Sequence, residues 1–157
     1  MEKPQIDSVA GLLAHAHWLE QEAARRYADL AAEMSGRKRD DLAEFFQSMA
    51  EIERRHVEKV DDMAEALELP ASHDEPPAWR AGDGPETPHR DASDIDTVRG
   101  AILLAMAGEK AAVAFFEDVR ASTRDLSVRR LAEDLAAEER HHVALLRNWL
   151  ARLEEEG

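Results

Sequence analysis

The sequence of 157 residues contains no cysteine. The chain therefore cannot form disulfides, a zinc ribbon or an iron–sulfur cluster held by thiolates, and it has no nucleophilic thiol. Any redox chemistry has to use oxygen and nitrogen ligands. The electrons for such chemistry must come from an external donor.

Aromatic residues are also scarce, at 5% of the chain, whereas alanine, leucine and charged residues are abundant. This composition predicts an all-α protein. Long apolar runs are missing too, so the sequence offers no candidate for a membrane span. Met1–Leu13 lacks the basic-then-apolar order of a signal peptide, and a cytoplasmic protein is therefore expected.

Basic residues are in the minority, with 20 Lys and Arg against 34 Asp and Glu, which gives a formal net charge of −14. Nucleic acids and anionic membranes attract basic surfaces, so neither is expected as a partner. An acidic surface attracts metal cations, although acidity alone is common among soluble proteins.

Proline is concentrated in one stretch, because five of the six prolines lie within residues 70–93. This stretch lacks helical periodicity, and at about 3.3 Å per residue it is long enough to cross a helical bundle. Four segments with helical apolar spacing flank it in two pairs, and the short links within each pair require antiparallel hairpins. We expect helices at about 6–35, 39–69, 94–121 and 125–154.

The predicted fold is a single all-α domain over residues 1–157, a four-helix bundle in which a long crossover joins two antiparallel helical hairpins. The alternative is a flexible linker between two independent hairpins. A lone hairpin buries little surface, which favours the bundle.

Each of the four segments has an apolar stripe that a carboxylate interrupts near the middle. At 100° per residue, these carboxylates point to the same side as their apolar neighbours. In the second and fourth segments a histidine follows the carboxylate after three residues and shares its face. The inward-facing polar residues are Glu20, Glu53, His56, Glu109, Glu139 and His142.

A metal pair explains these interruptions. A buried carboxylate is disfavoured unless it is protonated, paired or bound to metal, and four of them repel one another. Two divalent cations balance four carboxylates, and two imidazoles complete the ligand sets without adding charge. The alternatives are solvent-facing glutamates, ordinary core histidines and a surface lattice of salt bridges, which would require six coincidences at one depth.

The Glu-x-x-His pattern alone is weak evidence, because this chain is rich in both residue types. Glu86-x-x-His89 lies in the proline-rich stretch, and Glu138-x-x-His141 has its histidine on the outer face of the helix. Placement within an apolar stripe, rather than the pattern, selects the six residues.

At these positions the sequence resembles the ferritin-like di-iron carboxylate superfamily, particularly its rubrerythrin-type and bacterioferritin-type domains. Glu20 and Glu109 are each followed by an aromatic residue seven positions later, and E-R-R-H-V at 53–57 matches E-R-H-H-V at 139–143. Such internal duplication is typical of the family.

The resemblance implies a role for each candidate ligand. Glu20 and Glu109 would be terminal ligands, one on each metal, whereas Glu53 and Glu139 would bridge the two. His56 and His142 would each bind one metal. Tyr27 would be the aromatic residue near the site, with core packing as the alternative reading.

The implied cofactor is two iron ions, with manganese or a mixed Fe/Mn site as the alternative. The chain departs from the pattern of these families in three ways. Rubrerythrins carry a further carboxylate where this chain has Ala112, and they have a rubredoxin-like centre that needs cysteines. Bacterioferritins bind haem through a methionine where this chain has Arg54, so no haem is expected.

The expected function is that of a non-haem di-iron oxidoreductase that reacts with O₂ or H₂O₂ as a peroxidase or ferroxidase. The alternatives are an iron-binding or storage protein and a non-enzymatic helical interaction module. Trp18, Leu104 and Phe115 lie outside the apolar stripes, and we interpret them as the surface of a homodimer.

Overall fold

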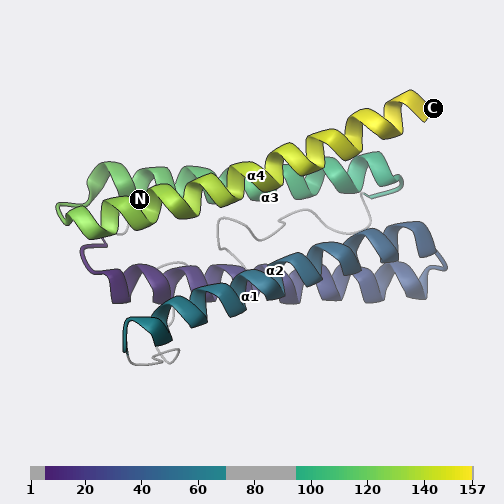
Figure 1. Ribbon diagram of the computed structural model, residues 1–157. Helices are drawn as coiled ribbons and strands as arrows, with labels where there is room; N and C mark the ends of the chain where they lie inside the picture. Colours follow the sequence, from purple (N-terminus) through teal and green to yellow (C-terminus); the bar gives the residue numbers. More distant parts are fainter. Residues whose placement is uncertain (1–5, 70–94, 157) are drawn as a thin grey trace.

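The computed structural model describes residues 6–69 and 95–156. Within these ranges the chain forms α1 (Val9–Gly36), α2 (Asp40–Ala66), α3 (Val98–Ser122) and α4 (Leu126–Glu156). Figure 1 shows α1 and α2 as one antiparallel hairpin, α3 and α4 as a second, and the two hairpins lying against each other as a four-helix bundle. The predicted all-α bundle of two hairpins is confirmed.

Two features of the prediction concern parts of the chain that the structure does not describe. The crossover predicted at 70–93 and the Glu86-x-x-His89 pattern within it lie outside the described residues. Among the described helices, none combines the length and the apolar character needed to cross a membrane.

The first helix of each hairpin begins with the same kind of cap. The Ser8 hydroxyl accepts a hydrogen bond from the backbone N–H three residues on, at 3.0 Å, and Thr97 does the same at 3.0 Å. Each cap lies twelve residues before a glutamate of the candidate site, Glu20 or Glu109. The caps therefore place both carboxylates at the same distance along their helices. The third helix was expected from about residue 94, but α3 begins only after Thr97.

The first helix ends within one residue of the expected position, whereas the second ends earlier than expected. The last residue of α1 is Gly36, and the left-handed conformation falls on Lys38, with φ 62°. The second helix ends at Ala66 rather than at Leu69, and Glu68 is left-handed, with φ 55°. In both cases a non-glycine residue takes the left-handed conformation that glycine favours.

Buried apolar side chains form two clusters, one toward each end of the bundle. The first core cluster lies toward the α1–α2 loop, and the second lies toward the α3–α4 loop. Members of the first include Tyr27, Met34, Leu42, Phe46, Ile102, Leu104 and Leu146. Members of the second include Leu12, Leu19, Phe115, Phe116, Val128 and Leu135.

All four helices pass from one cluster to the other, and in each helix the change falls at a candidate ligand. On α1, for example, the second cluster ends at Leu19 and the first begins at Ala23, with Glu20 between them. The polar layer is thus sealed by apolar packing on both sides along the bundle axis, which keeps bulk water from its ends.

Three apolar residues do not lie where the sequence places them. Leu104 and Phe115, predicted on an outer surface, are 6% and 9% exposed and belong to the two core clusters. Leu67, which lies within the helix predicted at 39–69, is 56% exposed because it follows the end of α2. Trp18 is partly buried. The predicted homodimer loses two of the three residues on which it rested, and it stays a prediction.

The helices pack closely within each hairpin and more sparsely between hairpins. One tie between the hairpins involves Asp7, which precedes α1. Its Oδ1 accepts hydrogen bonds from the Thr123 hydroxyl, at 3.1 Å, and from the Arg124 backbone N–H, at 3.3 Å. This tie fixes the start of α1 against the α3–α4 loop.

Candidate metal centre

The six predicted ligands meet in the polar layer between the two core clusters. Each helix contributes one glutamate, and α2 and α4 add a histidine one turn further on. The four carboxylates are at most 2% exposed, whereas the two histidine side chains are 12% and 13% exposed. The layer is therefore closed on the carboxylate side and slightly open on the histidine side.

The donor atoms fall into overlapping sets, within each of which all atoms lie within 4.8 Å of one another. One set comprises Glu20, Glu53 and His56, and a second comprises Glu53, Glu109 and His142. Glu139 joins the two histidines in a third. Because Glu53 belongs to the first two sets, cations held by those sets would be neighbours that share a carboxylate.

The His56 ring turns its Nδ1 toward three carboxylates. This nitrogen lies 3.2 Å from Glu20 Oε2, 3.5 Å from Glu139 Oε1 and 4.0 Å from Glu53 Oε2. The ring also stacks on His142, with centroids 4.3 Å apart and planes inclined by 18°. An imidazole nitrogen facing several carboxylate oxygens is the donor arrangement that a divalent cation requires.

The His142 side of the layer leaves buried polar atoms without hydrogen bonds. Nδ1 of His142 is 3.8 Å from both Glu109 Oε2 and Glu139 Oε2, which exceeds hydrogen-bond length. This nitrogen, Glu139 Oε2 and both carboxylate oxygens of Glu109 are buried and have no hydrogen-bond partner within residues 6–69 and 95–156. Unsatisfied groups of this kind are rare in native cores unless an ion or water serves them. The donors present therefore fit a bound cation.

The carboxylates destabilise one another in their charged forms. Burial raises the pKa of Glu20, and the negative charge of Glu139 raises it further. Burial also raises the pKa of Glu139, to about 7, and neighbouring Glu109 acts in the same direction. Without a cation, the layer therefore carries more negative charge than its surroundings can accommodate.

The two histidines respond in opposite ways. Burial lowers the pKa of His56, but contacts with Glu139 and Glu20 outweigh burial and raise it to about 10. Burial and the nearby positive charge of His56 lower the pKa of His142. In the metal-free protein a protonated His56 thus offsets part of the carboxylate charge, in the place where a metal would do so.

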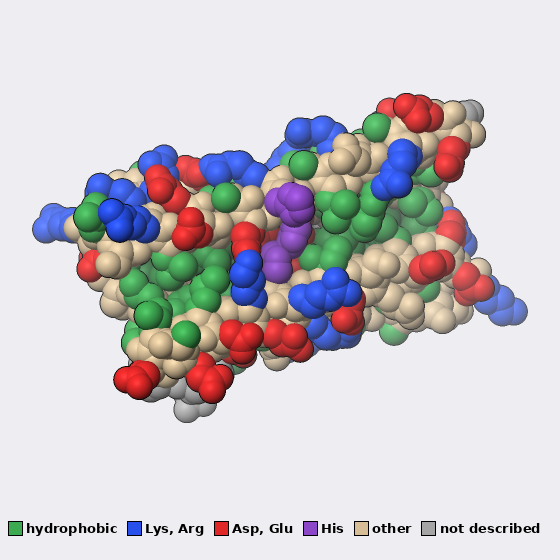
Figure 2. All heavy atoms as spheres, in the orientation of Figure 1, with side chains coloured by type: hydrophobic (Ala, Val, Ile, Leu, Met, Phe, Trp, Pro, Cys, Tyr) green, Lys and Arg blue, Asp and Glu red, His purple; other side chains and the backbone are tan. Residues whose placement is uncertain are grey.

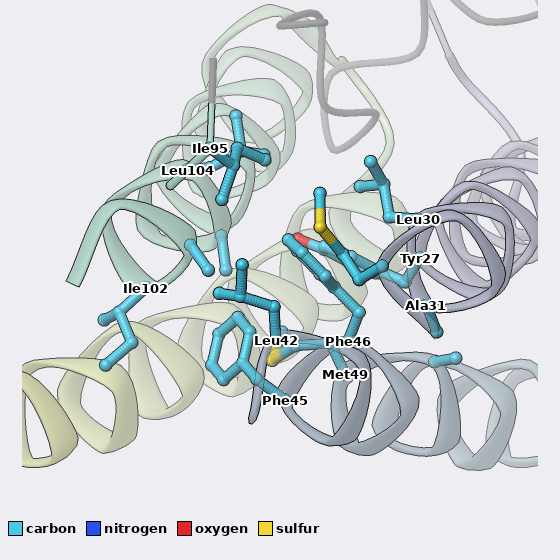
Figure 3. Packing of buried hydrophobic residues seen from close by; sticks show 14 of the residues in the cluster. Tyr27, Leu30, Ala31, Leu42, Phe45, Phe46, Met49, Ile95, Ile102 and Leu104 are labelled. Carbon is cyan, nitrogen blue, oxygen red and sulfur yellow. The ribbon is translucent and has the colours of Figure 1, made fainter. Parts of the chain in front are cut away.

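Tyr27 lies in the first core cluster, seven residues and about 10 Å along α1 from Glu20. Its ring is fully buried and stacks on Phe46, with centroids 6.2 Å apart (Figure 3). This packing matches the alternative reading of Tyr27 as a core residue, and its role near the site stays a prediction.

Sequence reasoning missed several polar residues around the layer. His17 is 8% exposed, and its Nδ1 lies 2.8 Å from Asp61 Oδ1 on α2. Lys59, Glu138 and His141 line a cleft that leads to the two ligand histidines. The only sequence signal for the cleft was the second Glu-x-x-His pattern at 138–141, which was set aside because His141 faces outward.

The comparisons with known proteins agree with this geometry. Residues 11–150 match the model of the family described as rubrerythrin. The chain is also similar to an uncharacterised conserved protein from Magnetospirillum magnetotacticum MS-1, with 32% sequence identity and a TM-score of 0.68 to its crystal structure. That match covers 92% of this chain and 95% of the other. A comparison with curated proteins finds no match.

The family match spans all six residues of the layer, and rubrerythrin-type domains hold metal through carboxylate and histidine ligands. With a family match over most of the chain and a similar bundle in a solved relative, the chain belongs to the rubrerythrin family.

Proposed function

We propose that the protein is a non-haem di-iron oxidoreductase that reacts an Fe(II) pair with H₂O₂ or O₂, as a peroxidase or ferroxidase. The observation that carries the proposal is the sharing of Glu53 between two three-residue donor sets, one with His56 and one with His142. Shared donors favour a pair of ions over a single one. Four carboxylates and two imidazoles match the charge and number of ligands that two divalent ions need.

Iron is proposed because the donors are oxygen and nitrogen only, which suits Fe(II) and leaves ligand positions open for an oxidant. Manganese, or a mixed Fe/Mn site, is the alternative that the same donors allow. Haem is not part of the proposal: Arg54, next to Glu53, is 56% exposed and lies near Glu51, at 3.5 Å, so its side chain points away from the layer.

Each of the six residues would have a definite role in binding the two ions. Glu20 and Glu109 would each bind one ion, Glu53 and Glu139 would bridge the pair, and each histidine would bind one ion. When bound, the iron pair supplies two electrons to the oxidant. The flanking core clusters exclude water along the bundle axis, so the oxidant meets the centre from the histidine side.

Ala112 distinguishes this chain from rubrerythrins that carry a further carboxylate in α3. Ala112 is completely buried and offers no ligand, although it lies three residues after Glu109 on the same helix. The proposed reaction therefore uses four carboxylates, and it does not depend on the ligand exchange that a fifth would permit.

Iron storage is a second candidate, since the layer is open to solvent on its histidine side. An interaction module without metal is less well supported, because burial of Leu104 and Phe115 removes the exposed apolar surface that suggested it.

Anaerobic loading with Fe(II), followed by metal analysis and addition of H₂O₂ or O₂, tests the proposal. We expect about two irons per chain, near-ultraviolet absorbance on oxidation, and consumption of the oxidant. Retention of many ferric ions per chain would instead indicate storage. The double variant Glu53→Ala/Glu139→Ala should bind no iron.

The matched control is Glu51→Ala/Glu133→Ala, which removes two exposed glutamates from the same two helices. It should bind iron as the parent does. A parent protein that binds neither iron nor manganese after loading would overturn the proposal.

A further inference from the structure

A cleft of about 400 Å³ opens between α2 and α4 on the face shown in Figure 2. In that view histidine side chains gather in the gap between the two front helices, with hydrophobic side chains on either side. The lining residues are His56, Lys59, Ala137, Glu138, His141 and His142.

The cleft is the side on which the metal centre meets solvent. The candidate ligands Glu20, Glu53, Glu109 and Glu139 are at most 2% exposed, whereas His56 and His142, at the base of the cleft, are 12% and 13% exposed. An ion that enters a folded chain must therefore pass these histidines before it meets the carboxylates.

The outer part of the cleft carries a second Glu-x-x-His pair. Glu138 and His141 are separated by three residues on α4 and therefore share a face of the helix. They repeat the pattern of Glu139 and His142 one position earlier, which rotates them by about 100° toward solvent. Carboxylate oxygen and imidazole nitrogen both bind divalent cations, and neither is needed to admit a neutral oxidant.

A lysine from the opposite wall pairs with the carboxylate of this outer pair. Lys59 on α2 forms an ion pair with Glu138 on α4 and is 54% exposed. The ammonium group therefore lies beside the carboxylate that an incoming cation would use. Ion pairs at this exposure contribute little to stability, so a divalent cation can displace the lysine at low cost.

We propose that the α2–α4 cleft is the entry route for divalent cations, and that Glu138 and His141 form a transit site on it which Lys59 occupies between loading events. The proposal rests on the proposed function only in requiring that the inner centre binds metal. It assigns a role to Glu138, His141 and Lys59, which the inner ligand set does not use.

Stopped-flow loading of chelator-treated full-length protein with Co²⁺ tests the route without any oxidant, because the visible absorbance of bound Co²⁺ reports occupancy. Glu138→Gln/His141→Ala should still reach the parent's final Co²⁺ content, but about tenfold more slowly, the lower end of what electrostatic steering contributes to association. Lys59→Met should load faster than the parent. Both differences should shrink at high salt.

Two exposed residues outside the cleft provide controls. Glu133→Gln removes a charge from the same helix as Glu138, and Lys110→Met removes a lysine next to the ligand Glu109. Neither should change the loading rate. Ala137→Trp offers a variant that keeps every charge, since its bulky ring would fill the cleft and should slow loading without changing the final Co²⁺ content.

Parent-like loading rates in Glu138→Gln/His141→Ala and in Ala137→Trp would overturn the proposed route. If these variants load Co²⁺ at the parent's rate but consume H₂O₂ at a different rate, the cleft admits the oxidant only, and the proposed route for cations is overturned as well. Failure of the parent to bind any Co²⁺, Fe²⁺ or Mn²⁺ would instead contradict the proposed function, so the two failures are distinguishable.

Discussion

Glu109 is the candidate ligand that should lower the stability of the metal-free protein most clearly. Its carboxylate is fully buried, neither oxygen accepts a hydrogen bond from the part of the chain that the structure describes, and Nδ1 of His142 is 3.8 Å away. Burying an unpaired charged group opposes folding, because the group gives up its hydration without compensation. The residue is therefore expected to favour metal binding at the expense of stability without metal.

Replacement of Glu109 by glutamine separates these two effects. In metal-free protein Glu109→Gln should raise the free energy of unfolding by about 1–3 kcal/mol, because the neutral amide does not repel the neighbouring carboxylates and can donate a hydrogen bond to Glu139. The same change should reduce the metal content of the loaded protein. Urea denaturation with and without metal measures both, with Glu133→Gln as the exposed control. A metal-free variant less stable than the parent would contradict this account.

The pKa shifts in the site predict how the stability of the metal-free protein depends on pH. Glu139 has a pKa raised to about 7. Its contribution to the free energy of unfolding is therefore greatest below pH 4.5, the ordinary pKa of a glutamate, and is lost as the pH rises toward 7. His56 has a pKa raised to about 10, so its contribution is present below 6.5 and is lost as the pH rises toward 10.

Both shifts act in the same direction, and the metal-free protein should therefore be more stable at pH 5 than at pH 9. Either group changes the free energy of unfolding by at most about 1.4 kcal/mol per pH unit. Denaturation at a series of pH values measures it, and Glu139→Gln should flatten the curve between pH 5 and 7. An unchanged slope in that variant would show that Glu139 titrates normally.

At the scale of single residues, the sequence was informative where a side chain interrupts a pattern. Glu20 and Glu109 stand out because their neighbours along the helix are apolar, and the structure brings them together with the other four candidates. Leu104 and Phe115 were misplaced for a physical reason. A helix in a bundle contacts a hairpin partner and a second hairpin, so its buried arc is wider than one stripe.

At the scale of elements, the helices were predictable but their ends were not. Periodicity over about 30 residues is a strong signal, whereas the last turn depends on local backbone geometry. The last residue of α1 is Gly36, close to the predicted end, but the left-handed conformation falls on Lys38. Its position is set by hydrogen bonds of the turn, including those from the backbone N–H of Arg39 to Met34 and of Lys38 to Ser35.

Opposite substitutions at Lys38 and Gly36 should therefore each stabilise the protein. Lys38→Gly should stabilise the protein by roughly 1 kcal/mol, because glycine adopts a positive φ without steric cost. Gly36→Ala should also stabilise it by roughly 0.5–1 kcal/mol, since Gly36 is helical and an added Cβ would contact nothing within 4 Å.

Gly11→Ala provides the matched contrast within the same helix. There an added Cβ would lie 2.9 Å from the Ser8 hydroxyl oxygen, which would displace the N-cap and cancel the gain in helix propensity. Thermal melting of the three variants measures the order. If Gly11→Ala stabilised as much as Gly36→Ala does, the cap would contribute nothing to the helix.

At the scale of the whole molecule, the site lies where the two hairpins meet. Packing is close within each hairpin and sparser between them, and each donor set except the first draws on both hairpins. Metal binding should therefore stabilise the association of the hairpins, as any ligand of the folded state alone does. The meeting of the hairpins at the six ligands was predicted from the sequence. The cleft between α2 and α4 was not, because it depends on side chains from helices that are distant along the chain.

Removal of metal should lower the melting temperature of the parent protein. At metal concentrations about a thousandfold above the dissociation constant, the loss corresponds to about 4 kcal/mol. Calorimetry of loaded and chelated protein measures it, and Glu53→Ala/Glu139→Ala should show no difference between the two conditions. Equal melting temperatures for the loaded and chelated parent would show that metal does not join the hairpins.

The equal spacing from cap to carboxylate in α1 and α3 has a consequence for how such a bundle can be built. Each hairpin carries one complete half of the ligand set, a glutamate twelve residues after the cap and a Glu-x-x-His in the following helix. Two copies of a single hairpin, related by a twofold axis, would present the same six donors. The chain is thus equivalent to a fused pair of half-proteins. In both halves the first helix has to keep the same number of residues between its cap and its glutamate, so that the two carboxylates face each other.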